Sequence, residues 1–201
     1  MGQEAMHDHE FKTHCDQIVH ASKNCSDRWH WVLEGDYSYI CMKKKHCVQL
    51  EHLEQRNVLN VPDNDTDFPE LAVENDPSSI PDTNAERTLS FEYHVLYSES
   101  YAVPTLLFNI YDEGGARLNL EDAWCVLNID EAVPSSERYN AITMVHHPAL
   151  FRPYLSLHPC KTSELMESLS GSTNPVISFL TSYGPFVNLE LDELMKLLQT
   201  V

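Results

Sequence analysis

Hydrophobic residues recur at helical spacing at the start of the chain and then alternate with polar ones. One face of residues 7–22 carries Phe11, Cys15, Ile18, Val19 and Ser22. This spacing predicts an amphipathic helix. The period changes to two in residues 29–32 and 37–41, on either side of the turn residues Gly35 and Asp36. We therefore expect two strands across residues 29–48.

The alternation returns between residues 88 and 111. One face of the first run carries Leu89, Phe91, Tyr93, Val95 and Tyr97. A second run extends from Pro104 to Tyr111, and proline is tolerated at the first residue of a strand because it has no N–H to donate. The short connection between the runs predicts an antiparallel hairpin.

Helix signals dominate the last third of the chain. Residues 119–127 begin with Asn119 and two acids, residues 174–183 begin with an Asn-Pro pair, and residues 188–198 show a third amphipathic pattern. Each is typical of a helix. Residues 128–141 have no clear pattern, and prolines at 148 and 153 predict an irregular, extended segment. The order predicts an α+β fold with an N-terminal helix, a four-stranded antiparallel sheet and C-terminal helices beside the sheet.

Residues 51–86 differ from the rest of the chain. They contain ten acidic residues against one basic residue, together with four prolines and almost no periodicity. Such a segment buries too little apolar surface to offset the entropy of ordering. We expect a flexible acidic insertion in a single domain that spans residues 1–201.

The charge of the chain limits its partners. The formal net charge is −18, so nucleic acid and anionic membranes are disfavoured and a basic protein partner is favoured. There is no apolar run of membrane-spanning length and no secretory signal. The six cysteines are irregularly spaced, which indicates reduced thiols and a cytoplasmic location.

One cysteine lies at a position that favours a reactive thiolate. Residues 154–157 alternate as a short strand, Pro159 should end it, and Thr162 resembles a helix cap. Cys160 is therefore expected on a strand-to-helix turn. A helix N-terminus and nearby positive charge from Lys161 would favour the thiolate. The alternative is a buried cysteine that acts as a small hydrophobic residue.

Several cysteine chemistries could use Cys160. A phosphatase loop needs an arginine six places after the nucleophile, where this chain has Met166, and a redox pair needs a C-x-x-C motif, which is absent. A cysteine hydrolase needs a histidine base, and the candidates are His94, His146, His147 and His158. A zinc site would draw on Cys41, His46, Cys47 and either His30 or His52, but this spacing lacks the paired ligands of structural zinc sites.

Three stretches of the chain, residues 91–98, 101–104 and 157–162, resemble a known family. They read Phe-Glu-Tyr-His-Val-Leu-Tyr-Ser, Tyr-Ala-Val-Pro and Leu-His-Pro-Cys-Lys-Thr. These stretches resemble the autophagy-related protein ten family of ubiquitin-like-conjugating enzymes, which are related to the autophagy-related protein three enzymes. The resemblance implies a ubiquitin-conjugating fold, in agreement with the order of elements above. We expect no cofactor or metal.

The resemblance also implies a reaction. Cys160 would accept the modifier autophagy-related protein twelve, as a thioester, from the activating enzyme autophagy-related protein seven. It would pass the modifier to a lysine of autophagy-related protein five without a separate ligase. Modifiers of the autophagy-related protein eight family are further candidate partners.

The sequence offers candidates, and no single choice, for the residues that assist Cys160. Ordinary conjugating enzymes have a His-Pro-Asn triplet ahead of the cysteine, whereas here His158 and Pro159 run directly into Cys160 and no such Asn precedes it. Tyr93 and Asn109 are the candidate oxyanion or amine-positioning groups, and a core aromatic is the competing role for Tyr93. We expect His158 and Pro159 to shape the turn. A partner-binding module without chemistry and a cysteine hydrolase remain alternatives.

Overall fold

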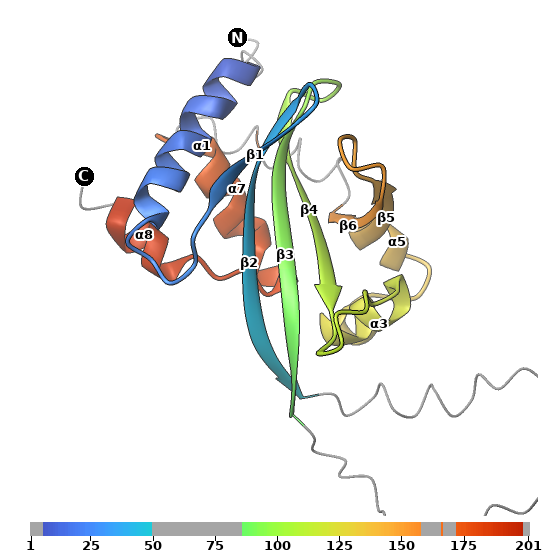
Figure 1. The fold of residues 1–201 in the computed structure, drawn as a ribbon. Coiled ribbons are helices and arrows are strands. Elements are labelled where there is room, and N and C mark those ends of the chain that lie inside the picture. Colours follow the sequence, from blue (N-terminus) through green and yellow to red (C-terminus); the bar gives the residue numbers. More distant parts are fainter. Residues whose placement is uncertain (1–5, 50–85, 158–165, 167–171, 199–201) are drawn as a thin grey trace, which may run out of the picture.

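A six-stranded antiparallel sheet forms the centre of the molecule (Figure 1). The computed structural model describes residues 6–49, 86–157, 166 and 172–198. The strand order is β1-β2-β3-β4-β6-β5. The strands are β1 (His30–Glu34), β2 (Tyr37–Gln49), β3 (Glu86–Ser98), β4 (Val103–Tyr111), β5 (Ile142–His146) and β6 (Pro153–Leu157).

Helices precede and follow the strands. They are α1 (Asp8–Ser22), α3 (Leu120–Val126), α4 (Ile129–Ala132), α5 (Arg138–Ala141), α7 (Pro175–Tyr183), the 3-10 helix η1 (Gly184–Val187) and α8 (Asp192–Leu198). Figure 1 shows α1, α7 and α8 on the same side of β2 and β3. Two helix starts follow the expected capping chemistry, because Asn119 and Asn174 accept hydrogen bonds from the backbone amides of Asp122 and Ile177.

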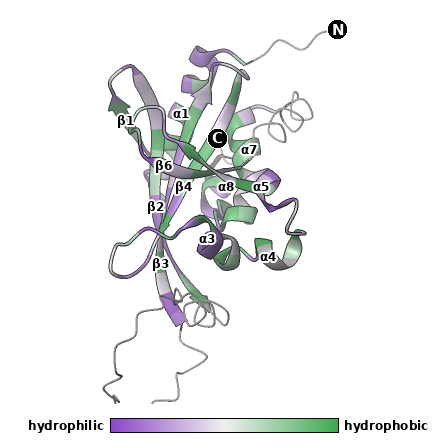
Figure 2. Cartoon of the chain, turned by 90° about the vertical axis from the view of Figure 1, so that its right-hand side faces the viewer, coloured by the Kyte–Doolittle hydropathy of each residue, from purple (hydrophilic) through white to green (hydrophobic). Residues whose placement is uncertain are grey.

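The main core lies between one face of the sheet and the helices. It includes Phe91 and Tyr93 from the predicted stripe, Phe108 from β4, Phe11 from α1 and Phe179 from α7. All five side chains are fully buried. The alternation of apolar and polar positions along the strands can be followed in Figure 2, and it explains why one sheet face is covered by helices.

The opposite face of the sheet has a smaller second cluster. It consists of Tyr39, Cys41, Leu96, Leu107, Ala149 and Tyr154. Ala149 belongs to the connection between β5 and β6, residues 147–152, which we call the β5–β6 loop. The loop lies over strand residues that point away from the helices, so part of this face is buried as well.

The long strands β2 and β3 remain paired up to their ends. Their register runs from Ile40 opposite Val95 to Gln49 opposite Glu86. The predicted insertion at residues 51–86 lies outside the described residues except for Glu86, which begins β3. The two strands therefore meet directly at the point where the insertion leaves the sheet.

Most predicted elements are confirmed, and the predicted number of strands is corrected. The sheet has six strands instead of four, because the short strand expected at residues 154–157 joins the sheet as β6 and residues 142–146, for which no element was predicted, form β5. Residues 128–141, which had no clear pattern, contain the short helices α4 and α5. The predicted helix after Thr162 lies outside the described residues, apart from a helical Met166. Over the part of the chain that is described, no helix has the length and apolar character needed to cross a bilayer.

Candidate functional site

Strand β6 leads directly to the candidate nucleophile. It ends at Leu157, three residues before Cys160, whereas His158, Pro159 and Cys160 themselves lie outside the described residues. β6 is held between two neighbours: Leu107 and Phe108 of β4 pair with Ser156 and Leu155, and all five residues of β5 pair with β6. Since β6 is antiparallel to β4, its end points toward the start of β4.

Tyr93 lies in the main core. Its side chain is fully buried, and its hydroxyl donates a hydrogen bond of 2.7 Å to the carbonyl oxygen of Val187. Burial raises the pKa of the Tyr93 hydroxyl above its ordinary value. The hydroxyl is therefore neutral and already bonded, and its place in the stripe between Phe91 and Phe108 is that of a core aromatic.

Asn109 lies on the other face of the sheet. Glu92 is its partner in the register of β3 and β4, whereas Tyr93 pairs with Phe108, so the two candidate oxyanion donors point to opposite faces. The Asn109 side-chain amide donates to the carbonyl of Pro153 at 3.3 Å, and its Oδ1 is buried without a hydrogen-bond partner among the described residues. The structure does not bring Tyr93 and Asn109 together.

A buried chain of three side chains lies on the same face as Asn109. A ring nitrogen of His147, Nε2, is 3.0 Å from Nδ1 of His94, and Nε2 of His94 is 2.9 Å from Oε1 of Glu92. His94 and His147 are 2 % and 0 % exposed. Both rings pack against Tyr39 and Tyr154, with ring centroids 4.7 to 5.0 Å apart.

The backbone of the β5–β6 loop decides where the protons of this chain lie. The amides of Ala149 and Leu150 both point at Nδ1 of His147, at 3.2 Å, so this nitrogen is an acceptor. A neutral His147 then carries its proton on Nε2 and donates it to His94 Nδ1. His94 in turn donates from Nε2 to the Glu92 carboxylate. Each ring proton of the two histidines therefore has a single position. The row of hydrogen bonds runs from the loop backbone through His147 and His94 to Glu92.

The pKa values of His147 and Glu92 agree with this arrangement. Burial is the main cause that lowers the pKa of His147 to about 4, and the positive charge of Arg152 acts in the same direction, so the ring is neutral at pH 7. The hydrogen bond from His94 is the main cause that lowers the pKa of Glu92 to about 2, and Lys43, 3.4 Å away, acts in the same direction. Glu92 is therefore ionised, and the chain ends on a fixed negative charge.

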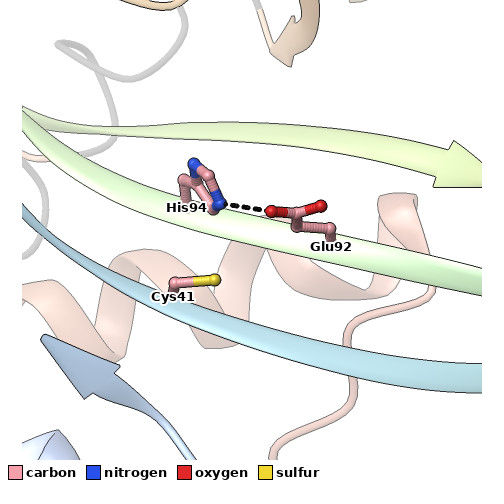
Figure 3. Close-up of side chains that lie close together, drawn as sticks. All are labelled: Cys41, Glu92 and His94. Carbon is pink, nitrogen blue, oxygen red and sulfur yellow. Dashed lines mark hydrogen bonds and ion pairs between the residues drawn. The ribbon is translucent and has the colours of Figure 1, made fainter. Parts of the chain in front are cut away.

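Three side chains of this region form the closest approach to a metal-ligand set in the described part of the chain. A ligand atom from each of Cys41, Glu92 and His94 lies within 4.8 Å of the others (Figure 3). Cys41 pairs with His94 across β2 and β3, and Glu92 is two residues away on the same face. Thiolate, imidazole and carboxylate together are zinc ligands.

The hydrogen bonds of this group favour a row of hydrogen-bonded side chains over a metal centre. If Nε2 of His94 bound a metal, the remaining ring proton would move to Nδ1, which faces His147. His147 would then accept hydrogen bonds at both nitrogens and carry no proton at all. Burial also raises the pKa of the Cys41 thiol to about 12, which disfavours the thiolate that a metal needs. A metal would fit only if the β5–β6 loop released His147.

The zinc ligands that the sequence suggested are not assembled. Cys41 and Cys47 face the same side of β2, but they are six positions apart along the strand, roughly 20 Å. His46 points to the other side, where its ring packs edge-on against Phe91. His52 lies outside the described residues.

Sequence reasoning named His94 and His147 only as possible bases and missed their partnership with Glu92. Glu92 and His94 are two residues apart on a predicted strand and so share a face, which is a signal that the sequence does carry. The third member, His147, is 53 residues later, and only the fold brings it to the same face.

Comparison with known proteins extends these observations to a family. The family model described as "Autophagocytosis associated protein, active-site domain" matches residues 10–193. A human protein named ubiquitin-like-conjugating enzyme ATG10 is 31 % identical over 210 residues, covering 90 % of this chain and 88 % of the relative. Proteins of the same name from Arabidopsis thaliana and Dictyostelium discoideum are 34 % and 31 % identical, covering 46 % and 50 % of this chain and 44 % and 51 % of those relatives. The chain is therefore a member of the ATG10 family of ubiquitin-like-conjugating enzymes, a class of transferases of autophagy.

Proposed function

We propose that Cys160 carries a ubiquitin-like modifier as a thioester and passes it to a lysine of an acceptor protein. The observation that carries the proposal is the position of Cys160, three residues after a strand fixed on both sides by β4 and β5, in a chain of this family. The proposed modifier is autophagy-related protein twelve, loaded by autophagy-related protein seven, and the proposed acceptor is autophagy-related protein five. Modifiers of the autophagy-related protein eight family are further candidates, and the proposed location is the cytoplasm.

The first step of this reaction is a transthiolation. The Cys160 thiolate attacks the carbonyl carbon of the modifier's C-terminal thioester on the activating enzyme. The resulting tetrahedral intermediate expels the activating enzyme's thiolate, so one thioester replaces another without an external oxidant or reductant. The step is fastest when the attacking thiol has a pKa near the ambient pH. A position before a helix N-terminus and beside Lys161 would favour such a pKa.

The second step is an aminolysis. The lysine amine of the acceptor attacks the thioester carbonyl, the Cys160 thiolate leaves, and the amine loses a proton as the isopeptide bond forms. A donor must stabilise the transient oxyanion. Tyr93 and Asn109 remain candidates, but Tyr93 would have to give up its bond to Val187 and Asn109 its bond to Pro153. His158 and Pro159 are assigned to shaping the turn.

One gel tests the assignment of Cys160. The full chain is mixed with activating enzyme, modifier and ATP, and the products are separated with and without reductant. We expect a reductant-sensitive adduct for the wild type and for Cys47→Ser, which removes the exposed cysteine of the described residues. Cys160→Ser should give no reductant-sensitive adduct. An undiminished reductant-sensitive adduct with Cys160→Ser would overturn the proposal, and labelling of Cys160 by an electrophilic modifier without activating enzyme would favour a hydrolase.

A further inference from the structure

Cys41, Glu92 and His94 bring a sulfur, a carboxylate oxygen and an imidazole nitrogen together on one face of the sheet. The three ligand atoms lie within 4.8 Å of one another (Figure 3). In a tetrahedral zinc site the ligand atoms are about 3.3–3.5 Å apart, because each lies about 2.0–2.3 Å from the metal. Nε2 of His94 and Oε1 of Glu92 are already 2.9 Å apart. A shift of about 1 Å therefore brings the set to metal-binding geometry.

The side chain of Glu92 gives a cation access to this group. It is 15 % exposed, and its neighbour Lys43, 3.4 Å away, is 67 % exposed and free to turn into solvent. A bound cation reverses the effect of burial on the Cys41 thiol, because a coordinating thiol is deprotonated outright. Water fills the fourth position in zinc sites that have three protein ligands.

A cation at this place forces ring protons to move. An ion on Nε2 of His94 displaces the proton that this nitrogen donates to Glu92, and the proton moves to Nδ1, 3.0 Å from Nε2 of His147. That nitrogen must then accept, so any proton of His147 moves to its Nδ1. There it faces two further donors, the amides of Ala149 and Leu150, at 3.2 Å. Donors cannot satisfy one another, so the ion and the closed β5–β6 loop exclude each other.

The closed loop contains backbone strain that opening would relieve. Phe151 has a φ of 53°, in the left-handed region that a bulky residue avoids. Its side chain is 81 % exposed, so packing does not offset this cost. The loop is held by His147, whose ring accepts from two loop amides and whose carbonyl accepts from the Phe151 amide. Loss of the two ring bonds therefore favours release of the loop.

We propose that Cys41, Glu92 and His94 form a binding site for a zinc-type divalent cation, and that the cation and the closed β5–β6 loop compete through the ring proton of His94. Binding releases the thiol proton of Cys41 to solvent and shifts the ring proton of His94 from Nε2 to Nδ1, with no change of oxidation state. The coupling is reciprocal: an ion in the site loosens the loop, and a closed loop weakens the ion. The site makes the loop responsive to zinc whether or not Cys160 carries a modifier.

Cobalt(II), displaced afterwards by Zn²⁺, is the probe of the site in the full chain. A thiolate ligand gives Co²⁺ a charge-transfer absorption band that a site without sulfur lacks. We expect this band in the wild type and in Cys47→Ser and Cys160→Ser, the matched controls that remove other thiols. Cys41→Ala should abolish it. Glu92→Gln, which keeps an oxygen acceptor for His94, should weaken Co²⁺ binding at least tenfold.

Two further measurements test the coupling to the loop. His147→Leu fills the space of the ring but removes the donor that opposes a proton on Nδ1 of His94, so Co²⁺ should bind at least tenfold more tightly, with circular dichroism confirming the fold. In the wild type, Zn²⁺ should speed hydrogen exchange of the Ala149 and Leu150 amides at least tenfold. The Leu189 amide, which donates to the carbonyl of Gly184 at 2.8 Å, is the control and should exchange at an unchanged rate.

Several results would overturn the proposal. The site is wrong if the wild type shows no thiolate band, if Cys41→Ala keeps the band, or if Cys160→Ser removes it. The coupling is wrong if His147→Leu leaves the Co²⁺ affinity unchanged, or if Zn²⁺ leaves exchange at Ala149 and Leu150 unchanged. A chain that binds Co²⁺ as expected but forms no thioester at Cys160 would contradict the proposed function alone.

Discussion

Tyr93 illustrates how a residue that the sequence nominates for chemistry can be fully engaged in packing. Its ring lies between Phe91 and Phe108 and its hydroxyl is bonded to Val187. Tyr93→Phe should lower the free energy of unfolding by about 1–2 kcal/mol, because a buried carbonyl loses its donor. Urea unfolding measures this loss.

The same variant tests the catalytic alternative. If Tyr93 only packs, transfer from loaded Cys160 to the acceptor proceeds in Tyr93→Phe at about the wild-type rate under conditions where both proteins are folded. A drop of a hundredfold or more, the size seen when an oxyanion donor is removed, would instead assign the hydroxyl to the reaction.

His147 makes stability depend on pH. Burial lowers its pKa from the ordinary 6.5 to about 4. The unfolded chain therefore binds a proton as the pH falls below 6.5, whereas the native chain does not. The stabilisation is complete above pH 6.5 and is lost as the pH falls toward 4, with a total of about 3 kcal/mol. Glu92, with its pKa lowered from 4.5 to about 2, extends the decline below pH 4.5.

His147→Asn isolates this contribution. Asn keeps an oxygen acceptor for the amides of Ala149 and Leu150 but does not titrate. The difference in unfolding free energy between wild type and variant, measured by urea titration at several pH values, should shrink as the pH falls from 6.5 to 4. Parallel curves for the two proteins over this range would contradict the assigned role of His147.

At the scale of elements, one tight contact sets the path from α7 to α8. A Cβ at Gly184 would collide with the backbone carbonyl oxygen of Leu189, and the Leu189 amide donates to the Gly184 carbonyl at 2.8 Å. Gly184→Ala should therefore cost about 3 kcal/mol, the upper range for overpacking. Gly35→Ala is the matched control: φ is +58° but space is open, so only the backbone cost of about 1 kcal/mol applies. Thermal unfolding of both variants gives the comparison, and equal losses would refute the steric explanation.

The register of β2 and β3 predicts that the acidic segment can be replaced. Gln49 and Glu86 are directly opposite each other in an antiparallel pair, which is the geometry that a two-residue turn closes. Replacing residues 50–85 by Asn-Gly should leave the fold intact, with a Tm within a few degrees of the wild type. Loss of the far-ultraviolet circular dichroism signal of the native chain would show that the segment supports the sheet.

The elements differ in how well the sequence predicts them. Stripes such as Phe91, Tyr93 and Val95 predicted β3 because one face of that strand is buried against helices. β5 was missed because Ile142–His146 is a five-residue edge strand with a single buried residue, so it shows no clear stripe of buried apolar positions. Strand pairing with β6, which the local sequence does not contain, makes this segment a strand.

At the scale of the molecule, the candidate site was only partly accessible from the sequence. Cys160 could be singled out because its signals, a strand, a proline and a helix cap, are local. The Glu92–His94–His147 chain could not, because it joins a central strand to a loop 53 residues later. Likewise, the net charge of the whole chain predicted a basic partner. The sequence alone does not show that the fold leaves the positive side chain of Arg152 exposed beside Phe151.

The distribution of thiols has a practical consequence. Cys15, Cys25, Cys41 and Cys125 are buried, whereas Cys47 is exposed near the end of β2. A fluorescent maleimide added to the native chain should therefore spare these four sulfurs, and in a Cys47→Ser background any remaining label reports on position 160. On denaturation the four protected sulfurs become reactive together. The number of dyes per chain over time therefore measures the rate of global unfolding.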